Sequence, residues 1–399
     1  DILQTAEDNC TPPTPFSNDQ NLLAYSIRKS GNGTGFPVDS LDNPVATIQY
    51  SCDELGTQTG ELWARDLAGN TSFCTFTVAI DDPNSYCSPL ALNIGGTIKT
   101  EADTSITNAM VTFVAMQPPV DSTVLTDGQG IFLFESIFPG GTYTLTPFKD
   151  DNPLNGVSTF DLLLISKHIL DIQALDSPYK IIAADANKSG SVTTFDVVEI
   201  RKLILGIYNK LPANTSWRFV DKDYVFPNQA NPFQDTFPEF IMRTNITTDQ
   251  LDNDFVGIKV GDVNNTVHPD NFVTTQDRTA GTLFFRTSDR NVERDEEFTV
   301  SFKAAEKVLG YQFTLNINGL EVVDILPGAG MTTENFGVFS DAVTASVEKD
   351  AGEFDVTFRA TKAGRLSDML GISSRITRAE AYKANDTTTT IPSAEGRAS

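Results

Sequence analysis

The stretch Val157-Ser-Thr-Phe-Asp-Leu-Leu-Leu-Ile-Ser-Lys-His-Ile-Leu170 recurs in this chain of 399 residues as Val192-Thr-Thr-Phe-Asp-Val-Val-Glu-Ile-Arg-Lys-Leu-Ile-Leu205. The copies begin at residues 157 and 192, an offset of 35, and eight of the fourteen aligned pairs are identical. Such self-similarity indicates an internal duplication. Apolar residues recur at helical spacing in both copies, so each is expected to form an amphipathic helix after a loop. The matching apolar positions are Leu162, Ile165 and Ile169 in one copy and Val197, Ile200 and Ile204 in the other.

The loop before the second copy, residues 185–196, has the spacing of a twelve-residue calcium loop. Oxygen-bearing side chains stand at positions one, three, five and twelve, Gly190 stands at the sharp turn, and Thr193 can hold a water. Calcium takes six to eight oxygen ligands, which this alternation supplies. The expected ligands are the side chains of Asp185, Asn187, Ser189 and Asp196 and the carbonyl of Ser191. The alternative is a polar turn that caps the helix.

The loop before the first copy departs from this pattern. Asp150, Asn152 and Asp161 stand at positions one, three and twelve, but position five is Leu154, and the glycine falls one place late. Pro153 also stiffens the middle of the loop. Calcium in this loop therefore requires altered geometry, and the sequence leaves its presence open.

Residues 150–207 resemble the type I dockerin module, through both Asp-Xaa-Asn starts and both Thr-Phe-Asp…Ile-Leu helices. The resemblance implies a pair of half-motifs without entering helices and a cohesin partner chosen by residues just before the last loop aspartate. Those residues are Thr159-Phe160 and Thr194-Phe195, and phenylalanine there is more typical of buried core than of recognition. The module is expected to span residues 149–279, with an irregular, proline-broken segment over 208–279 wrapped around it. Asp262 in that segment either belongs to a plain turn or contributes to a calcium site.

Residues 1–87 hold all four cysteines and alternate in the β manner, as in Ala46–Tyr50, Glu61–Arg65 and Cys74–Val78. The pattern favours an immunoglobulin-like sandwich and disulfides formed in an oxidising compartment. If the last three strands are antiparallel neighbours, Cys52 and Cys87 fall at one pole and Cys74 at the other. The expected pairs among the three possible pairings are Cys10–Cys74 and Cys52–Cys87. The segment resembles the hyalin-repeat domain through Glu7–Cys10 and Ala64–Asn70, which implies a stalk or adhesion module.

Two further β domains and a tail are expected. Residues 88–148 resemble prealbumin-like repeats of bacterial surface proteins through Thr126–Phe132 and Gly141–Leu145, which implies a spacer. Residues 280–384 resemble the cohesin jelly roll through Leu309–Leu315 and Leu320–Asp324, and residues 385–399 form a polar, threonine-rich tail. The predicted fold class is therefore mainly β, with tandem sandwiches, one small helical calcium module and a jelly roll. The whole order resembles surface proteins exported by the type IX system, and the start at Asp1 suggests a mature product.

Composition narrows the function classes. The formal net charge is −24 with two histidines, which argues against nucleic-acid binding and imidazole catalysis. No nucleophile elbow, P-loop or zinc-protease motif occurs, and no run of about 20 apolar residues is present. We therefore expect a non-enzymatic, extracellular, calcium-stabilised rod or fibre subunit. Its partner is expected to be a second copy of itself, joined head to tail, or another cohesin- or dockerin-like surface protein.

Two alternatives remain at this point. One is an adhesin or glycan-binding protein, favoured if aromatics on the C-terminal domain are exposed; the other is an accessory part of a larger secreted hydrolase. The aromatics in question are Phe284, Phe285, Tyr311 and Phe313. Glycans attached to this chain are expected at Ser40, Ser122 and Thr387, where Asp-Ser and Asp-Thr pairs resemble an O-glycan acceptor of the same bacterial lineage.

Overall fold

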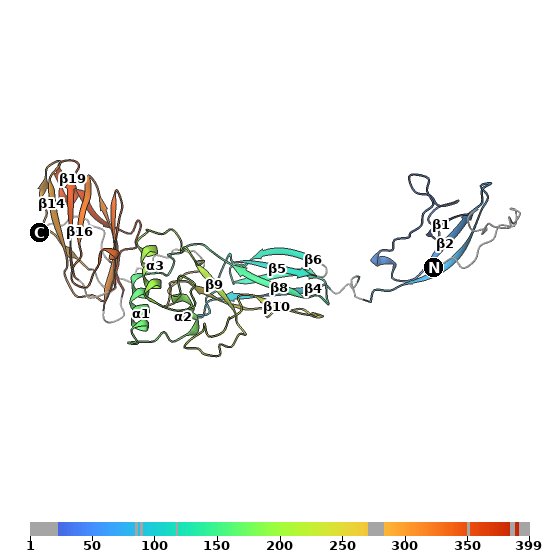
Figure 1. The fold of residues 1–399 in the computed structure, drawn as a ribbon, viewed down its shortest axis with the longest axis horizontal. Helices are drawn as coiled ribbons and strands as arrows, with labels where there is room; N and C mark the ends of the chain where they lie inside the picture. The colour runs from blue at the N-terminus through green and yellow to red at the C-terminus, as the bar shows by residue number, and fades with distance from the viewer. Residues whose placement is uncertain are drawn as a thin grey trace. The chain divides into compact units, whose positions relative to one another are not determined.

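The computed structural model describes residues 23–83, 87, 91–116, 119–269, 283–348, 352–383 and 388–390. The chain divides into two compact units, residues 1–91 with 138–140 and residues 92–137 with 141–399. Both are built mainly from β-strands, as predicted, and helices α1, α2 and α3 lie together in one part of the second unit (Figure 1).

The first unit contains one antiparallel sheet of β1 (Ala24–Lys29), β2 (Gly56–Arg65) and β3 (Thr71–Ile80), in that order. Residues 46–50 do not form the strand that was expected, and no second sheet of a sandwich occurs among the described residues of this unit. The short 3-10 helix η2 (Cys52–Glu54) carries Cys52, which forms the predicted disulfide with Cys87. Cys74 is exposed on β3, and because Cys10 lies outside the described residues its pairing with Cys74 stays a prediction.

The second unit begins with two four-stranded sheets packed around an aromatic and aliphatic core. The strand orders are β10-β8-β5-β6 and β7-β4-β11-β9 (Figure 1). Five strands come from the expected prealbumin-like segment: β4 (Leu92–Lys99), β5 (Met110–Met116), β6 (Pro119–Leu125), β7 (Ile131–Ile137) and β8 (Tyr143–Phe148). The other three are β9 (Trp217–Asp221), β10 (Ile241–Arg243) and β11 (Phe255–Lys259).

This topology corrects the expectation of an irregular wrap over 208–279. That segment supplies strands to both sheets, with β10 antiparallel to β8 and β11 parallel to β4. Trp217, Phe219 and Phe255 are buried in the sandwich core, while Val220 and Ile258 face the helical core. The β domain and the helical module are therefore joined by shared strands.

The helical module consists of α1 (Thr159–Ile169), α2 (Pro178–Ala184) and α3 (Thr194–Ile204). The two helices predicted from the repeat are α1 and α3, which pack against each other through Leu162, Ile165, Ile200 and Ile204. Helix α2 was not expected; Ser177 caps it, Pro178 occupies its first turn, and it ends at Asp185. The second loop therefore has a short entering helix, which the dockerin resemblance did not predict.

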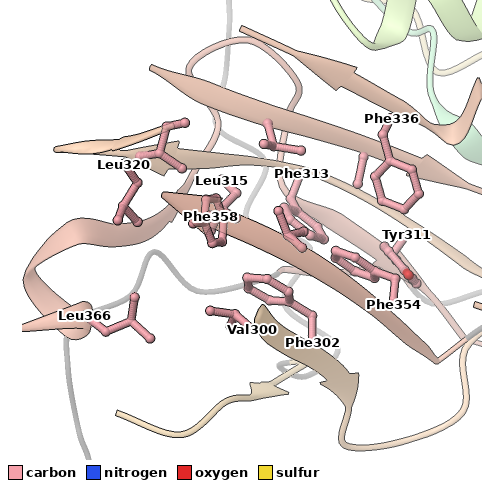
Figure 2. Close-up of a cluster of buried hydrophobic side chains, with 14 of the residues drawn as sticks. Val300, Phe302, Tyr311, Phe313, Leu315, Leu320, Phe336, Phe354, Phe358 and Leu366 are labelled. Carbon is pink, nitrogen blue, oxygen red and sulfur yellow. The ribbon is translucent and has the colours of Figure 1, made fainter. Parts of the chain in front are cut away.

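The C-terminal part of the second unit is a sandwich whose two main sheets enclose aromatic side chains (Figure 2). The rings of Phe302, Phe313, Phe336 and Phe354 meet between the sheets, with ring centres 5.0 Å apart for Phe302–Phe354 and for Phe336–Phe354. One sheet has the order β12-β14-β19-β16, and the other has the order β17-β18-β15-β22-β23 with β21 also paired to β15.

The elements of this sandwich are β12 (Phe285–Arg286), β13 (Asn291–Val292), β14 (Glu297–Ala304), β15 (Gly310–Ile317), β16 (Leu320–Leu326), η3 (Thr333–Asn335), β17 (Phe336–Val338), β18 (Ala342–Val347), β19 (Glu353–Ala360), β20 (Gly364–Arg365), α4 (Leu366–Met369), β21 (Leu370–Ser373), β22 (Glu380–Tyr382) and β23 (Thr388–Thr390). Strands β13 and β20 form a separate two-stranded sheet.

Candidate functional site: the duplicated loops and the surface that carries them

The second loop brings its predicted oxygen donors together. Asp185 accepts hydrogen bonds from the backbone N–H groups of Ser189 and Gly190, both at 2.8 Å. Asp196 accepts from the N–H of Asn187 at 3.2 Å and from the N–H of Thr193 at 2.8 Å. These bonds tie the carboxylates at positions one and twelve to the backbone of positions three, five, six and nine, which draws the predicted donor residues together.

The backbone of the second loop turns as the calcium pattern requires. Lys188 has φ 57° and Gly190 has φ 77°, both in the left-handed region that glycine adopts without strain. The Ser189 hydroxyl donates to the Ser191 carbonyl at 3.2 Å, which places that carbonyl beside the other oxygens. All of these contacts are made within residues 185–196.

Electrostatics favour a cation in the second loop. Asp185 and Asp196 are both fully buried, and burial, with a contribution from the Asp185 charge, raises the pKa of Asp196 above its ordinary value. No ion pair to either carboxylate occurs in the part of the chain that the structure describes. Two buried carboxylates without a counter-charge are costly unless a cation or a proton neutralises them. The donor set therefore fits calcium.

The first loop is arranged differently. Asp150 accepts a hydrogen bond from the N–H of Ser216 at 2.9 Å, and Asp161 accepts one from the N–H of Val263 at 2.9 Å. Asn152 is exposed at φ 44°, and Asp161 is fully buried. The structure therefore turns two of the three predicted side chains toward other segments, and the first loop does not present the donor set of the second.

Asp262 lies at the first loop, buried to 3% exposure. Its carboxylate accepts from the N–H groups of Asn264, Thr266 and Val267, and burial raises the pKa of Asp262 to about 6. Burial and the nearby Asp262 charge raise the pKa of Asp161 well above its ordinary value. Asp262 thus makes the hydrogen bonds of a plain turn, the first of the two sequence alternatives, beside the first loop; its contribution to a calcium site stays a prediction.

The helical pair carries these loops onto one sheet of the C-terminal sandwich. Strands β15 and β18 alternate, with Tyr311, Phe313 and Leu315 in the sandwich core and polar side chains on the opposite face. That opposite face is buried as well. The polar residues on it are Gln312, Thr314, Thr344 and Ser346, each 2% exposed or less, and Glu348 at 9%.

Contacts from α1 and α3 cover this polar face. The N–H of Thr159 donates to Gln312 at 2.7 Å, and the Thr159 and Ser346 hydroxyls are 2.7 Å apart. Thr344 donates to the carbonyl of Leu205 at 2.8 Å, so the start of α1 and the end of α3 both reach the sheet. We call the surface formed by these helix ends and the polar face of β15 and β18 the helix–sheet interface.

The helix–sheet interface also buries charge and leaves no room at a helix end. Arg201 pairs with Glu348, with both side chains about nine-tenths buried. Thr377 donates to the carbonyl of Ile204 at 2.7 Å. A Cβ on Gly206 would lie 2.4 Å from the Ile376 side chain, so only glycine fits there. Such closely packed, hydrogen-bonded contact is typical of a stable internal interface.

The paired positions proposed to select a cohesin partner have different surroundings. Phe160 packs on Tyr382 of the sandwich with ring centres 5.4 Å apart, whereas Phe195 is 73% exposed. The expectation of two buried core phenylalanines is therefore wrong for Phe195. In the C-terminal domain, Tyr311 and Phe313 are buried and Phe285 is partly buried, leaving Phe284 exposed. The aromatic face that would favour an adhesin is not formed by these four residues.

The remaining sequence-based candidates are scattered. Ser40 is exposed next to the turn made by Asp39, Ser122 is partly exposed on β6, and Thr387 lies outside the described residues. Glycosylation at all three stays a prediction. Among the described residues, no group of three or more His, Cys, Asp or Glu side chains could hold a metal ion. An ion in the second loop would thus rely on amide, hydroxyl and carbonyl oxygens as well as two carboxylates. No helix in the described part of the chain is long and apolar enough to cross a membrane.

Comparison with known proteins gives weak structural neighbours. No protein-family model matches the chain. No curated protein matches it either. A non-cellulosomal cohesin from Archaeoglobus fulgidus is 18% identical, with 28% of this chain and 85% of that chain covered and a TM-score of 0.21. A type I cohesin–dockerin complex from Clostridium thermocellum is 10% identical, covering 28% and 93%, with a TM-score of 0.21. The major pilin subunit BcpA of Bacillus cereus is 9% identical, covering 74% of this chain and 65% of that chain, with a TM-score of 0.21. Scores this low establish nothing about the function of this chain.

Proposed function

We propose that this chain is a non-enzymatic structural segment of an extracellular surface protein, in which the helical module is fastened to the C-terminal sandwich of the same chain. The helix–sheet interface carries the proposal. Thr159, Thr344 and Thr377 make buried hydrogen bonds across it, and separating the two faces would leave these groups exposed or unpaired. The interface therefore joins the helical module and the C-terminal sandwich into one stiff body.

Calcium has a defined place in this proposal. An ion held by Asp185, Asn187, Ser189, Asp196 and the Ser191 carbonyl would neutralise the buried carboxylates beside the start of α3. Because α3 ends at the helix–sheet interface through Ile204 and Leu205, fixing its start also fixes the helix that reaches the sheet. The modest number of carboxylates suits the millimolar calcium of extracellular fluid. The disulfide Cys52–Cys87 is likewise suited to an oxidising compartment.

Pairing within the chain bears on how copies could assemble. A head-to-tail polymer through the helical module and the sandwich would require the same surfaces that the helix–sheet interface already buries. Assembly by these modules would therefore need exchange of the sandwich between chains, and other modes of fibre formation would use other surfaces. Export by the type IX system and attached glycans remain part of the proposal as features that the sequence suggests.

A protease site inserted in the full chain after residue 275 tests the pairing. After cleavage, the two fragments are expected to co-elute on size exclusion, because the helix–sheet interface holds them together. Arg201→Glu places a second carboxylate against Glu348 and should separate the fragments, and adding Glu348→Arg should restore co-elution. Fragments of the unsubstituted chain that separate at micromolar concentration would exclude the proposal. Electron microscopy of the uncut chain with calcium then distinguishes single rods from filaments.

A further inference from the structure

The first loop is filled by a segment from elsewhere in the chain. Residues 259–268, which follow β11, contact it along its length. The Thr266 hydroxyl donates to the carbonyl of Gly156 at 2.9 Å. Asn155 and the backbone of His268 exchange two hydrogen bonds, of 2.8 and 3.1 Å. These are the positions at which a calcium loop turns and offers its backbone oxygen.

Two buried ammonium groups lie at the first loop: Lys149, which pairs with Asp151 at 3.0 Å, and Lys259. Lys259 is 3% exposed, and its Nζ donates to the carbonyl of Pro153 at 3.1 Å and to that of Ser216 at 3.3 Å. Burial lowers the pKa of Lys259 to about 7, while the charges of Asp262, Asp151 and Asp150 favour its protonated form. The Lys259 side chain thus already donates to the Pro153 carbonyl of this loop and lies close enough to its carboxylates to feel their charge.

The glycine of the first loop shows how little space remains. Gly156 has φ 81°, and a Cβ there would lie 2.7 Å from Asp262 Oδ2 and 2.7 Å from the backbone of Val267. At Gly190 of the second loop, the nearest atom to such a Cβ is 4.0 Å away. The first loop is therefore closely packed against residues 259–268, whereas the second loop is open at the corresponding turn.

We propose that the first loop binds no metal ion because hydrogen-bond donors from Ser216 and from residues 259–268 already occupy its oxygens, so the chain binds one calcium ion and not two. Ser216 satisfies position one, Thr266 satisfies the glycine carbonyl, and Val263 satisfies position twelve. The consequence concerns the helix–sheet interface. Helix α1, which presents Thr159 and Phe160 to the sandwich, is held by protein contacts alone, so its contact with the sheet does not depend on calcium.

The test is an ion count on matched variants. Native mass spectrometry of the full chain, titrated with calcium chloride after chelation, is expected to show one bound ion. Asp150→Asn, at an exposed position-one residue, should leave the count at one, whereas the corresponding Asp185→Asn should reduce it to zero. Circular dichroism confirms that both variants are folded.

The outcomes separate this inference from the proposed function. Two ions in the unsubstituted chain, or loss of an ion in Asp150→Asn, overturns the inference for the first loop. A count of zero in the unsubstituted chain contradicts the calcium site of the second loop and leaves the inference for the first loop standing. One ion in both the unsubstituted chain and Asp150→Asn, with none in Asp185→Asn, supports both.

Discussion

The two copies of the duplicated motif share their helices and differ in how their loops are held. Donors to the side chains of Asp185 and Asp196 come from within the second loop, whereas donors to Asp150, Asp161 and Gly156 include groups at residues 216, 263 and 266. The second loop has two buried carboxylates without an ion pair and an open turn at Gly190, which together favour the binding of an ion. In a loop braced by distant residues, the protein's own groups take the hydrogen bonds and the space that an ion would use. Duplication of a sequence therefore does not duplicate its chemistry when the rest of the fold covers one copy.

The copies also contribute opposite ends to the helix–sheet interface. The first copy presents the start of its helix through Thr159, and the second presents the end of its helix through Ile204 and Leu205. Their counterparts point elsewhere: Leu170, which corresponds to Leu205, is 67% exposed. The duplicated pair of helices therefore contacts the sandwich on one side only, where the start of the first helix and the end of the second lie together.

The largest expected effect comes from the buried ion pair of the second copy. Arg201→Met leaves the buried Glu348 carboxylate without its counter-charge and with only the 3.5 Å contact from Asn335, which typically costs about 3–5 kcal/mol of the free energy of unfolding. Ser166→Ala, at the corresponding position of the first copy, should change it by less than about 0.5 kcal/mol. Urea unfolding followed by circular dichroism measures both. The double variant Arg201→Met with Glu348→Leu should recover most of the loss, because both charges are then gone.

The second largest expected effect is the stabilisation by calcium, which should depend on the second copy and not on the first. At a calcium concentration one hundred times the dissociation constant, binding to the folded state alone adds about 2.7 kcal/mol to the free energy of unfolding. The unsubstituted chain and Asp150→Asn should both gain this amount over samples in EDTA. Asp185→Asn should gain nothing. Equal gains in all three would place the ion outside both loops.

The two loop glycines offer a comparison that is independent of the metal. Both Gly156 and Gly190 have positive φ, so alanine at either position costs about 1–2 kcal/mol in backbone strain. Gly156→Ala also forces a methyl group against Asp262 and Val267, which adds about 1–3 kcal/mol of overpacking. Unfolding in EDTA should therefore show Gly156→Ala as the more damaging change. Equal losses would mean that residues 259–268 move to accommodate the methyl group, which would contradict close packing of the first loop.

The sequence predicted what depends on local pattern. Helical spacing predicted α1 and α3 to within two residues at each end, and the calcium spacing predicted donors that the structure brings together around Asp185 and Asp196. Helix α2 was missed because it has only seven residues, although Ser177-Pro178 is a recognisable start signal. The filling of the first loop by residues 259–268 was not predicted, since Asp262 was considered only as part of a turn or of a calcium site.

What the sequence could not predict depends on distant partners. Strands β9 to β11 are three to five residues long, and a proline-containing segment separates β9 from β10. They become strands by pairing with each other or with β4 and β8. Gln312 and Ser346 alternate with apolar residues and look solvent-facing, since a covered polar face has the same pattern as a hydrated one. Lys259 gave no local sign that it would be buried.

The smallest expected effect is a pH dependence confined to the second copy. The pKa of Asp196 in the folded chain is raised above its ordinary 3.8, first by burial and then by Asp185. Below that ordinary value the carboxyl is neutral in both states; as pH rises through the folded-state pKa, the unfolded chain holds fewer protons and the folded state loses stability. In EDTA, Asp196→Asn should therefore gain free energy of unfolding relative to the unsubstituted chain as the pH rises above 3.8. Saturating calcium should reverse the order at pH 7, because the ion favours the ionised carboxylate that asparagine lacks. Thermal unfolding at a series of pH values, with and without calcium, measures both trends. If the stability advantage of Asp196→Asn in EDTA shrinks as the pH rises, the protein's own hydrogen bonds already stabilise the Asp196 carboxylate, as they do the oxygens of the first loop.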